Sequence, residues 1–167
     1  MTWYYFDANA LAKRYSPEKG TDLISELFRQ VSIAQMTCLT LSLLEIMSIL
    51  VRKKNDGRLS KDTFDQAVIN FQAEIIDSDD FVKSAINDNL VLSAFSFIAR
   101  HSINSTDAVI LRSVLNLKAR SDANGDRMVL LTSDKRLVKA ARNENVIVFD
   151  PEVETLASLQ TLLTTSP

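Results

Sequence analysis

Several residue types with specialised structural or chemical roles are scarce in this chain. The 167 residues include one cysteine, three glycines, three prolines and one histidine. A single cysteine, Cys38, allows neither an internal disulfide nor a cysteine-based zinc site, and it fits a reducing compartment. The low glycine and proline content favours regular elements joined by short connections over long linkers.

Long apolar runs and a strong charge of one sign are also missing. No run of about 18 apolar residues is present, and the chain does not open with the basic and then apolar pattern of a secretion signal. We therefore expect a cytoplasmic protein with no part in a membrane. Nineteen Lys and Arg against 21 Asp and Glu give a net charge of −2. This balance gives no support for nucleic-acid binding, although it allows a local basic patch.

The apolar runs and capping residues predict strands that alternate with helices in one domain. Strand patterns lie at residues 3–6, 31–37, 74–77, 128–132 and 146–149, and helical patterns at 9–15, 22–30, 40–54, 61–72, 79–100, 107–119 and 135–143. This alternation predicts a three-layer α/β/α sandwich with a mainly parallel central sheet. Residues 1–150 are expected to form the main domain. Residues 151–167 are expected to add a C-terminal helix and tail, with Asp150 as the cap before Pro151.

The same patterns predict loops and buried faces. Residues 101–106 and 121–127 read as loops. The helix at 40–54 is apolar almost all round until its basic end, so it is buried or meets a partner. The apolar residues in the second half of helix 79–100 are expected to face the core: Leu90, Val91, Leu92, Ala94, Phe95, Phe97 and Ile98.

Four acids occupy positions where functional residues are often found in such a fold. Asp7 and Asp134 each end an apolar strand and precede a helix, and the carboxyl ends of parallel strands share one edge. Glu45 and Asp107 are expected in first helical turns. Each acid could also have a purely structural role. Ser42 and Glu45 have the spacing of a capping box, and the other three acids could cap helices or interact with the positive N-terminal ends of helices.

Taken together, the four acids predict a metal-binding site. Two carboxylates about 4 Å apart repel by about 4 kcal/mol at an effective dielectric near 20, so a cation is expected among them. Oxygen ligands without His or Cys suit Mg²⁺ or Mn²⁺, and such an ion suits hydrolysis of a phosphodiester. The only histidine, His101, reads as a loop residue without a visible catalytic partner.

Four segments resemble, in order and spacing, the motifs of PIN-domain ribonucleases, and more closely the VapC-type toxins of type II toxin–antitoxin systems. These segments are residues 7–20, 40–46, 105–111 and 132–137. The resemblance extends from about residue 4 to residue 150. It implies a Mg²⁺- or Mn²⁺-dependent endoribonuclease whose metal pocket consists of Asp7, Glu45, Asp107 and Asp134.

The resemblance also implies a role for each residue. Asp7 and Asp107 would be direct ligands, whereas Glu45 and Asp134 would act partly through waters. Asn9, Thr106 and Ser133 would be supporting polar neighbours. Asn9 stands where the family usually has Ser or Thr, which is a departure from the pattern.

RNA needs cations near an acidic pocket. Lys13, Arg14, Lys135 and Arg136 are the candidates for RNA binding, and the basic end of helix 40–54 could add to them. These cations could equally be ordinary solvated helix faces. The resemblance implies a cognate antitoxin as partner, and the surplus apolar surface on the helices at 41–51 and 90–98 could serve that antitoxin or a homodimer.

Two other functions are considered. A haloacid-dehalogenase-type phosphatase also uses an Asp after the first strand, but it needs a second acid two residues later, where this chain has Asn9. A PIN-like module that only binds a partner is the non-enzymatic alternative. The presence of all four acids argues against it.

Overall fold

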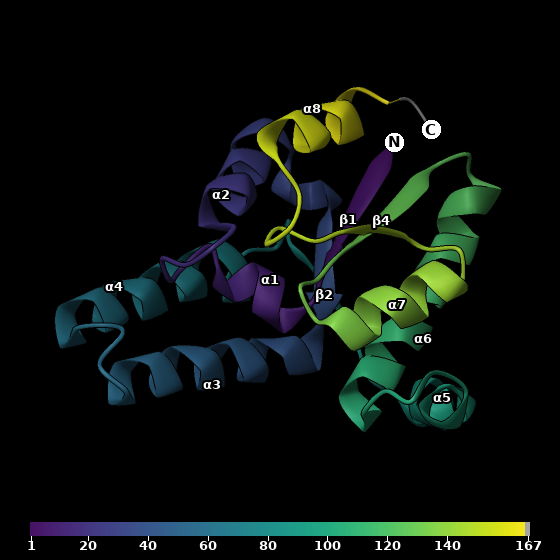
Figure 1. The fold of residues 1–167 in the computed structure, drawn as a ribbon, viewed down its shortest axis with the longest axis horizontal. Helices are drawn as coiled ribbons and strands as arrows, with labels where there is room; N and C mark the ends of the chain where they lie inside the picture. Colours follow the sequence, from purple (N-terminus) through teal and green to yellow (C-terminus); the bar gives the residue numbers. More distant parts are fainter. Residues whose placement is uncertain (166–167) are drawn as a thin grey trace.

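The chain folds around a five-stranded parallel sheet in the order β3-β2-β1-β4-β5 (Figure 1). The computed structural model describes residues 1–165. The strands are β1 Thr2–Phe6, β2 Met36–Leu39, β3 Val82–Ser84, β4 Arg127–Leu131 and β5 Ile147–Phe149. The α-helices are α1 Ala8–Ala12, α2 Thr21–Gln30, α3 Thr40–Asn55, α4 Lys61–Phe71, α5 Asp88–His101, α6 Ser105–Ala123, α7 Lys135–Asn143 and α8 Leu156–Thr164.

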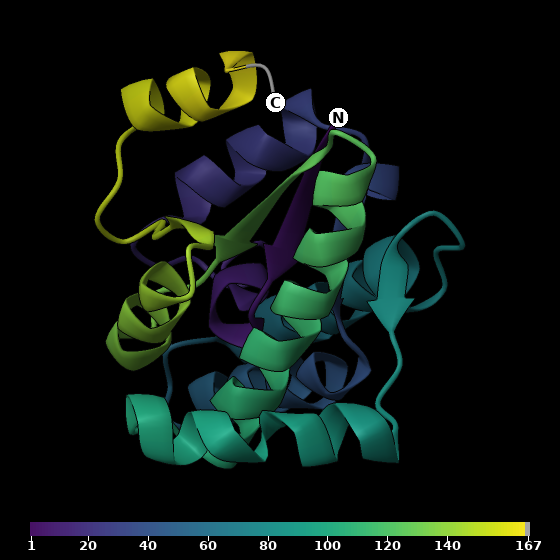
Figure 2. The same ribbon diagram turned by 90° about the vertical axis from the view of Figure 1, so that its right-hand side faces the viewer.

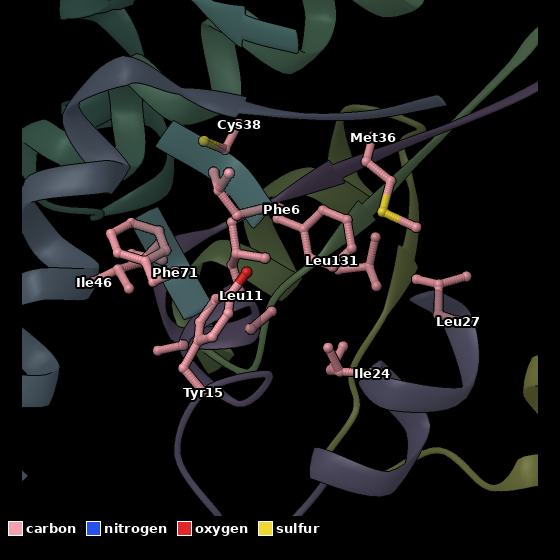
Figure 3. Packing of buried hydrophobic residues seen from close by; sticks show 14 of the residues in the cluster. Phe6, Leu11, Tyr15, Ile24, Leu27, Met36, Cys38, Ile46, Phe71 and Leu131 are labelled. Atoms are coloured by element: carbon pink, nitrogen blue, oxygen red, sulfur yellow. The ribbon is translucent and has the colours of Figure 1, made fainter. Parts of the chain in front are cut away.

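Two hydrophobic clusters cover the two faces of the sheet and make the expected three layers. The side chains of β1 alternate between them, so that Tyr4 and Phe6 enter one cluster and Tyr5 enters the other. Helices α1 to α4 and α8 supply the first cluster, which Figure 3 shows around Phe6. Helices α5, α6 and α7 supply the second, and Figure 2 shows α6 lying across that face.

The strand order places a switch point at the centre of the sheet. The chain moves outward from β1 to β2 and β3, and then returns to build β4 and β5 on the other side of β1. Ligands of open parallel sheets bind beyond the carboxyl ends of strands at such a point. Asp7 follows β1 directly, and Thr132, Ser133 and Asp134 follow β4.

Several predicted elements differ from those observed in the first half of the chain. The strand expected at 31–37 is instead a short 3₁₀ helix, Ile33–Gln35, followed by β2, because the Ser32 hydroxyl accepts the Ala34 amide and starts a helical turn. The strand expected at 74–77 is wrong. Residues Gln72–Ile76 continue α4 as a π-helix, which directs Ile75 into the core.

The helix expected at 79–100 is half wrong. Its first part is the edge strand β3, and helix α5 begins only after Asn87, whose side chain accepts the Leu90 amide. Not all of its apolar residues face the core as expected. Leu90, Ala94 and Phe97 are buried, whereas four others are exposed, namely Val91, Leu92, Phe95 and Ile98. Helix α5 therefore has two apolar stripes, of which one packs into the core and the other faces outward.

Loop boundaries also differ from the predictions. Helix α6 continues to Ala123, so only the turn around Gly125 remains of the loop expected at 121–127. His101 is the last residue of α5 rather than part of a loop. Its imidazole lies 2.8 Å from a Glu144 carboxylate oxygen, a partner that the sequence pattern does not reveal.

The C-terminal segment packs against the start of α2. The final helix begins at Leu156 with Thr155 as its cap, not at Asp150, whose carboxylate closes a turn by accepting the Glu152 amide. Gly20 caps α2 at φ +91°, and a Cβ there would lie 2.5 Å from the Pro151 carbonyl oxygen. Only glycine therefore allows this close approach.

Helix α8 lies beside α2 and carries one fully buried side chain, that of Leu159 (Figure 1). We predict that Leu159→Ala lowers the free energy of unfolding by about 2–4 kcal/mol, because it leaves a cavity in the first cluster. Leu156→Ala, on the same helix but 49% exposed, should cost less than about 1 kcal/mol. Urea denaturation measures both, and equal losses would show that α8 does not belong to the core.

Candidate active site

The four predicted acids all line one cavity at the carboxyl end of the sheet. Its volume is about 380 Å³, and its walls come from Asp7 at the end of β1, from α1, α3 and α6, and from the β4–α7 connection. The lining residues are Asp7, Ala8, Asn9, Glu45, Ser48, Ile49, Arg52, Asp107 and Asp134. Residues from four separate segments of the chain therefore meet where the strand order predicts a binding crevice.

Asp7 is the most constrained acid of the site. Its backbone amide donates to the Leu131 carbonyl, so it continues the pairing of β1 with β4 past the last strand residue. Its carboxylate accepts the Ala8 amide at 2.7 Å, the Thr132 hydroxyl at 2.8 Å and the Asn9 side-chain amide. The side chain thus caps α1 and is fixed by neutral donors alone.

Asn9 and Thr132 tie the ends of β1 and β4 together. The Asn9 carbonyl oxygen accepts the Ser133 amide at 2.9 Å while its amide group donates to Asp7. The Thr132 hydroxyl donates to Asp7 and accepts the Asp134 amide at 3.1 Å. The Asn side chain makes this two-way bridge with two separate atoms, whereas a serine hydroxyl at position 9 would have to donate and accept through one oxygen on a shorter side chain.

Asp107 and Asp134 are held by helix starts. Asp107 is in the first turn of α6, and Asn104 donates to its carboxylate at 2.9 Å while accepting its amide at 2.8 Å. Asp134 caps α7 by accepting the Arg136 and Leu137 amides through Oδ1. The structural roles predicted for these two acids at helix starts are therefore confirmed, and both carboxylates also line the cavity.

Glu45 reaches the cavity for a reason different from the one expected. Helix α3 begins at Thr40 after Leu39, so Glu45 is in the second turn and forms no capping box with Ser42. Ser42 is fully buried, and its hydroxyl has no hydrogen-bond partner within residues 1–165. Glu45 is half-buried on the face of α3 that also carries Ser48, Ile49 and Arg52.

The pKa values of the acids reflect their burial and the presence of four carboxylates in one cavity. Burial raises the pKa of Asp7 to about 6, and the Asp134 charge adds to this rise. Burial followed by the charges of Asp134, Asp7 and Glu45 raises the pKa of Asp107 to about 7, whereas Arg136 lowers it. Burial and the Asp7 charge also raise the pKa of Glu45. Within residues 1–165 none of the four acids forms a salt bridge.

The cavity has the donor chemistry of a divalent cation site, though not a finished coordination shell. Among the described residues no group of three or more His, Cys, Asp or Glu side chains converges closely enough to hold a metal as it stands. The unpaired carboxylates nevertheless fit a hard divalent ion, because the possible ligands that line the cavity are oxygen atoms, and burial together with neighbouring acid charges raises the pKa of Asp107.

The supporting residues differ in their placement. Asn9 lines the cavity as expected, whereas Thr106 and Ser133 do not. The Ser133 hydroxyl is buried and has no partner within residues 1–165. The sequence patterns do not single out Thr132 and Asn104 as part of the site, and they include Arg52 only within the basic end of helix 40–54. Asn104 could have been found from its position three residues before Asp107, and Arg52 from its position two helical turns after Glu45.

The two early cations predicted to bind RNA are paired with acids of this chain. Lys13 is 2% exposed, and its ammonium lies 2.6 Å from Glu152. Arg14 binds both carboxylate oxygens of Glu74 and lies over the Phe28 ring. By contrast, Lys135 and Arg136 are exposed at the start of α7, next to Asp134.

The comparison with known families decides the identity of the fold. The model of the PIN domain matches residues 4–143. The chain belongs to the PIN-domain family. The family resemblance of the four motifs and the α/β/α sandwich are both confirmed. PIN domains are generally nucleases.

Solved structures share the PIN fold at low sequence identity. FitAcB from Neisseria gonorrhoeae aligns with a TM-score of 0.60 and 13% identity, over 90% of this chain and 99% of that chain. PAE2754 from Pyrobaculum aerophilum gives 0.59 and 15%, over 98% and 97%. FitAB bound to an IR36 DNA fragment gives 0.57 and 14%, over 91% and 97%. No curated protein sequence matches the chain.

The raised pKa values of the PIN-domain acids predict how stability depends on pH without metal. Because Asp7 and Asp107 titrate near 6 and 7 rather than at 3.8, the folded protein binds more protons than the unfolded chain between about pH 4 and pH 7. The free energy of unfolding should therefore fall as the pH rises through that window. We expect a lower Tm at pH 7.5 than at pH 5 in the presence of a chelator.

A charge-removing variant tests the cause of this fall. Asp107→Asn should raise the Tm of the metal-free protein at pH 7.5 by about 3–6 °C, because it removes one of the repelling charges. Asp62→Asn is the matched control, since Asp62 occupies the first turn of α4 but is exposed. A Tm equal to wild type in Asp107→Asn would contradict the proposed repulsion.

Proposed function

We propose that this PIN domain is a Mg²⁺- or Mn²⁺-dependent endoribonuclease that hydrolyses RNA phosphodiesters. The observation that carries the proposal is the cavity at the switch point, which Asp7, Glu45, Asp107 and Asp134 line without forming a salt bridge within residues 1–165. Asp7 and Asp107 would hold the ion directly, whereas Glu45 and Asp134 would act partly through waters. When bound, the ion would lower the pKa of a water molecule, so that the water could act as nucleophile at neutral pH, and would neutralise charge on the phosphoryl oxygen.

The residues around the acids would position the substrate. Asn9 and Thr132 fix the Asp7 carboxylate by hydrogen bonds, so that it keeps one orientation. Arg136 is near enough to Asp107 to lower its pKa, which places a positive charge beside the cavity. Arg52 lines the cavity from α3. These two cations, with Lys135, would bind phosphates on either side of the bond that is cut.

A partner protein is part of the proposal. The four motifs resemble those of VapC-type toxins, and structural neighbours of this fold include FitAcB and FitAB bound to a DNA fragment. We propose that the chain is the toxin of a toxin–antitoxin pair and that a cognate antitoxin blocks the acidic cavity. A small open reading frame next to this gene would support the pair. Cytoplasmic location stays a prediction, and within residues 1–165 no helix is long and apolar enough to cross a membrane.

The alternatives have less support. A binding-only PIN module needs no cluster of unpaired acids, which costs stability in the absence of a ligand. The phosphatase alternative needs a second acid at position 9. The Asn9 side chain there is committed to Asp7 and Ser133 instead.

The nuclease proposal predicts metal-dependent cleavage of single-stranded RNA by the purified protein. Asp7→Asn should lower the rate by about a hundredfold or more, because it weakens an interaction worth several kcal/mol in the transition state. It should also abolish the rise in Tm that Mn²⁺ gives the wild type. Asp22→Asn, in the exposed first turn of α2, should behave as wild type. Cleavage that survives in a chelator, or that Asp7→Asn leaves intact, would refute the proposal.

The outward stripe of α5 predicts a homodimer interface. Leu92 is 73% exposed and Phe95 is 78% exposed on adjacent turns of this helix, and apolar stripes of this kind mark protein interfaces. Phe95→Asp should convert a dimer into an 18.7 kDa monomer, as measured by light scattering after gel filtration. Val153→Asp, 73% exposed in a turn, is the control. A monomeric wild type would contradict the dimer and leave this stripe to the antitoxin.

A further inference from the structure

A second and larger cavity adjoins the acidic one. Its volume is about 600 Å³, against about 380 Å³ for the acidic cavity. Three residues line both cavities, namely Asn9, Ile49 and Arg52. The two cavities are therefore neighbours with a common wall, and a chain that leaves the acidic cavity on this side enters the second one.

Helix α3 forms the wall that runs along both cavities. Glu45, Ser48, Ile49 and Arg52 follow each other at the spacing that places side chains on one helical face. The first end of this face holds the acid Glu45. Its other end holds Arg52, and Asn55 in the last turn lines the second cavity only. A ligand lying along this face would thus pass from carboxylates to a cation.

The floor of the second cavity consists of two buried lysines that share one glutamate. Lys13 and Lys53 are 2% and 5% exposed, respectively. Glu18 lies 3.4 Å from the Lys13 ammonium through one carboxylate oxygen and 2.7 Å from the Lys53 ammonium through the other. Glu152 holds Lys13 at 2.6 Å, and the Ser16 hydroxyl accepts from Lys53 at 2.7 Å.

This floor is polar and closely balanced in charge. Buried charges are tolerated only when paired, and an apolar floor of the same shape would stabilise the fold at least as well. The ion-paired floor instead provides hydrogen-bonding groups in a concave site. At the rim, Arg52 is exposed and forms no ion pair within residues 1–165. It is the cation left to bind an anion.

We infer that the second cavity binds the nucleotide of the RNA that flanks the scissile phosphodiester. Arg52 contacts the phosphate that joins this nucleotide to the scissile one, and the polar wall faces the ribose and base. The volume lies within the range of about 300–1,000 Å³ typical of sites for small ligands, which suits one nucleotide of a single strand. This inference rests on the proposed nuclease function and adds a substrate subsite to it.

The test separates binding in this cavity from catalysis. Asn55→Trp fills the second cavity from the end of α3 without touching the acidic one, and Arg52→Ala removes the rim cation. Both are made in the Asp7→Asn background. The dissociation constant for a fluorescein-labelled, mixed-sequence single-stranded RNA of twelve nucleotides is then measured by anisotropy in Mg²⁺. Arg120→Ala, an exposed cation at the far end of α6, is the matched control.

We expect each variant to weaken RNA binding by about tenfold or more, as for the loss of one phosphate contact or one base contact. Arg120→Ala should bind as the Asp7→Asn parent does. With Asp7 restored, Asn55→Trp should raise KM for RNA cleavage about tenfold and change kcat less than twofold, because it removes substrate binding and leaves the acids in place. Equal melting temperatures show that the fold is kept.

The outcomes distinguish the subsite from the nuclease function. Loss of RNA binding in Asn55→Trp supports the subsite even if the wild type cuts no RNA. Absence of cleavage by the wild type would refute only the nuclease function. Unchanged RNA binding in both variants overturns the subsite even if the wild type cleaves RNA. Unchanged RNA binding combined with lost capture of the antitoxin would also overturn it, and would assign the cavity to a protein segment. Absence of RNA binding in the Asp7→Asn parent overturns it as well.

Discussion

The carboxyl end of the sheet depends on one carboxylate that the fold buries without a positive partner. Asp7 is 5% exposed, and its protein contacts are hydrogen bonds from the Ala8 amide, Asn9 and Thr132. Three further acids share its cavity, and the charge of one of them, Asp134, adds to the rise in the pKa of Asp7 that burial causes. An arrangement that violates ordinary charge pairing at one place in an otherwise well-packed domain is typical of a functional site.

The packing of the sheet stabilises this group of acids. β1 is its central strand and is covered on both faces by hydrophobic clusters, so Asp7 lies at the end of a strand that is packed on both sides. The bridges through Asn9 and Thr132 then hold the end of β4 beside it. Stability from the core offsets the repulsion between the acids, which remain in place without a salt bridge within residues 1–165.

The sequence is most informative where position depends on local order. Asp7 and Asp134 could be placed because a strand that ends at an acid before a helix occurs twice in a parallel pattern, and Asp107 because it starts a helix. Glu45 is predicted on the correct helix but for the wrong reason. Its helix starts at Thr40, so its place in the cavity depends on the tertiary position of α3 rather than on a cap.

Features that depend on distant partners could not be predicted. The edge strand β3 has three residues and includes a lysine, and its extended form depends on pairing with β2. Lys13 reads as a solvated cation in sequence because its partner Glu152 follows 139 residues later. The outward apolar stripe of α5 looks like core for a similar reason, since periodicity alone does not show how many faces of a helix are covered.

These long separations have a consequence for when the acidic cavity forms during synthesis. The Thr132 hydroxyl that holds Asp7 follows it by 125 residues, and the glutamate that pairs with Lys13 is near the end of the described chain. Neither contact exists before the ribosome has made residue 132. The acidic cavity therefore forms only after β4 and Asp134 have been made, and the adjoining polar floor only after Glu152. A nascent chain that has not reached Asp134 has no complete acidic cavity.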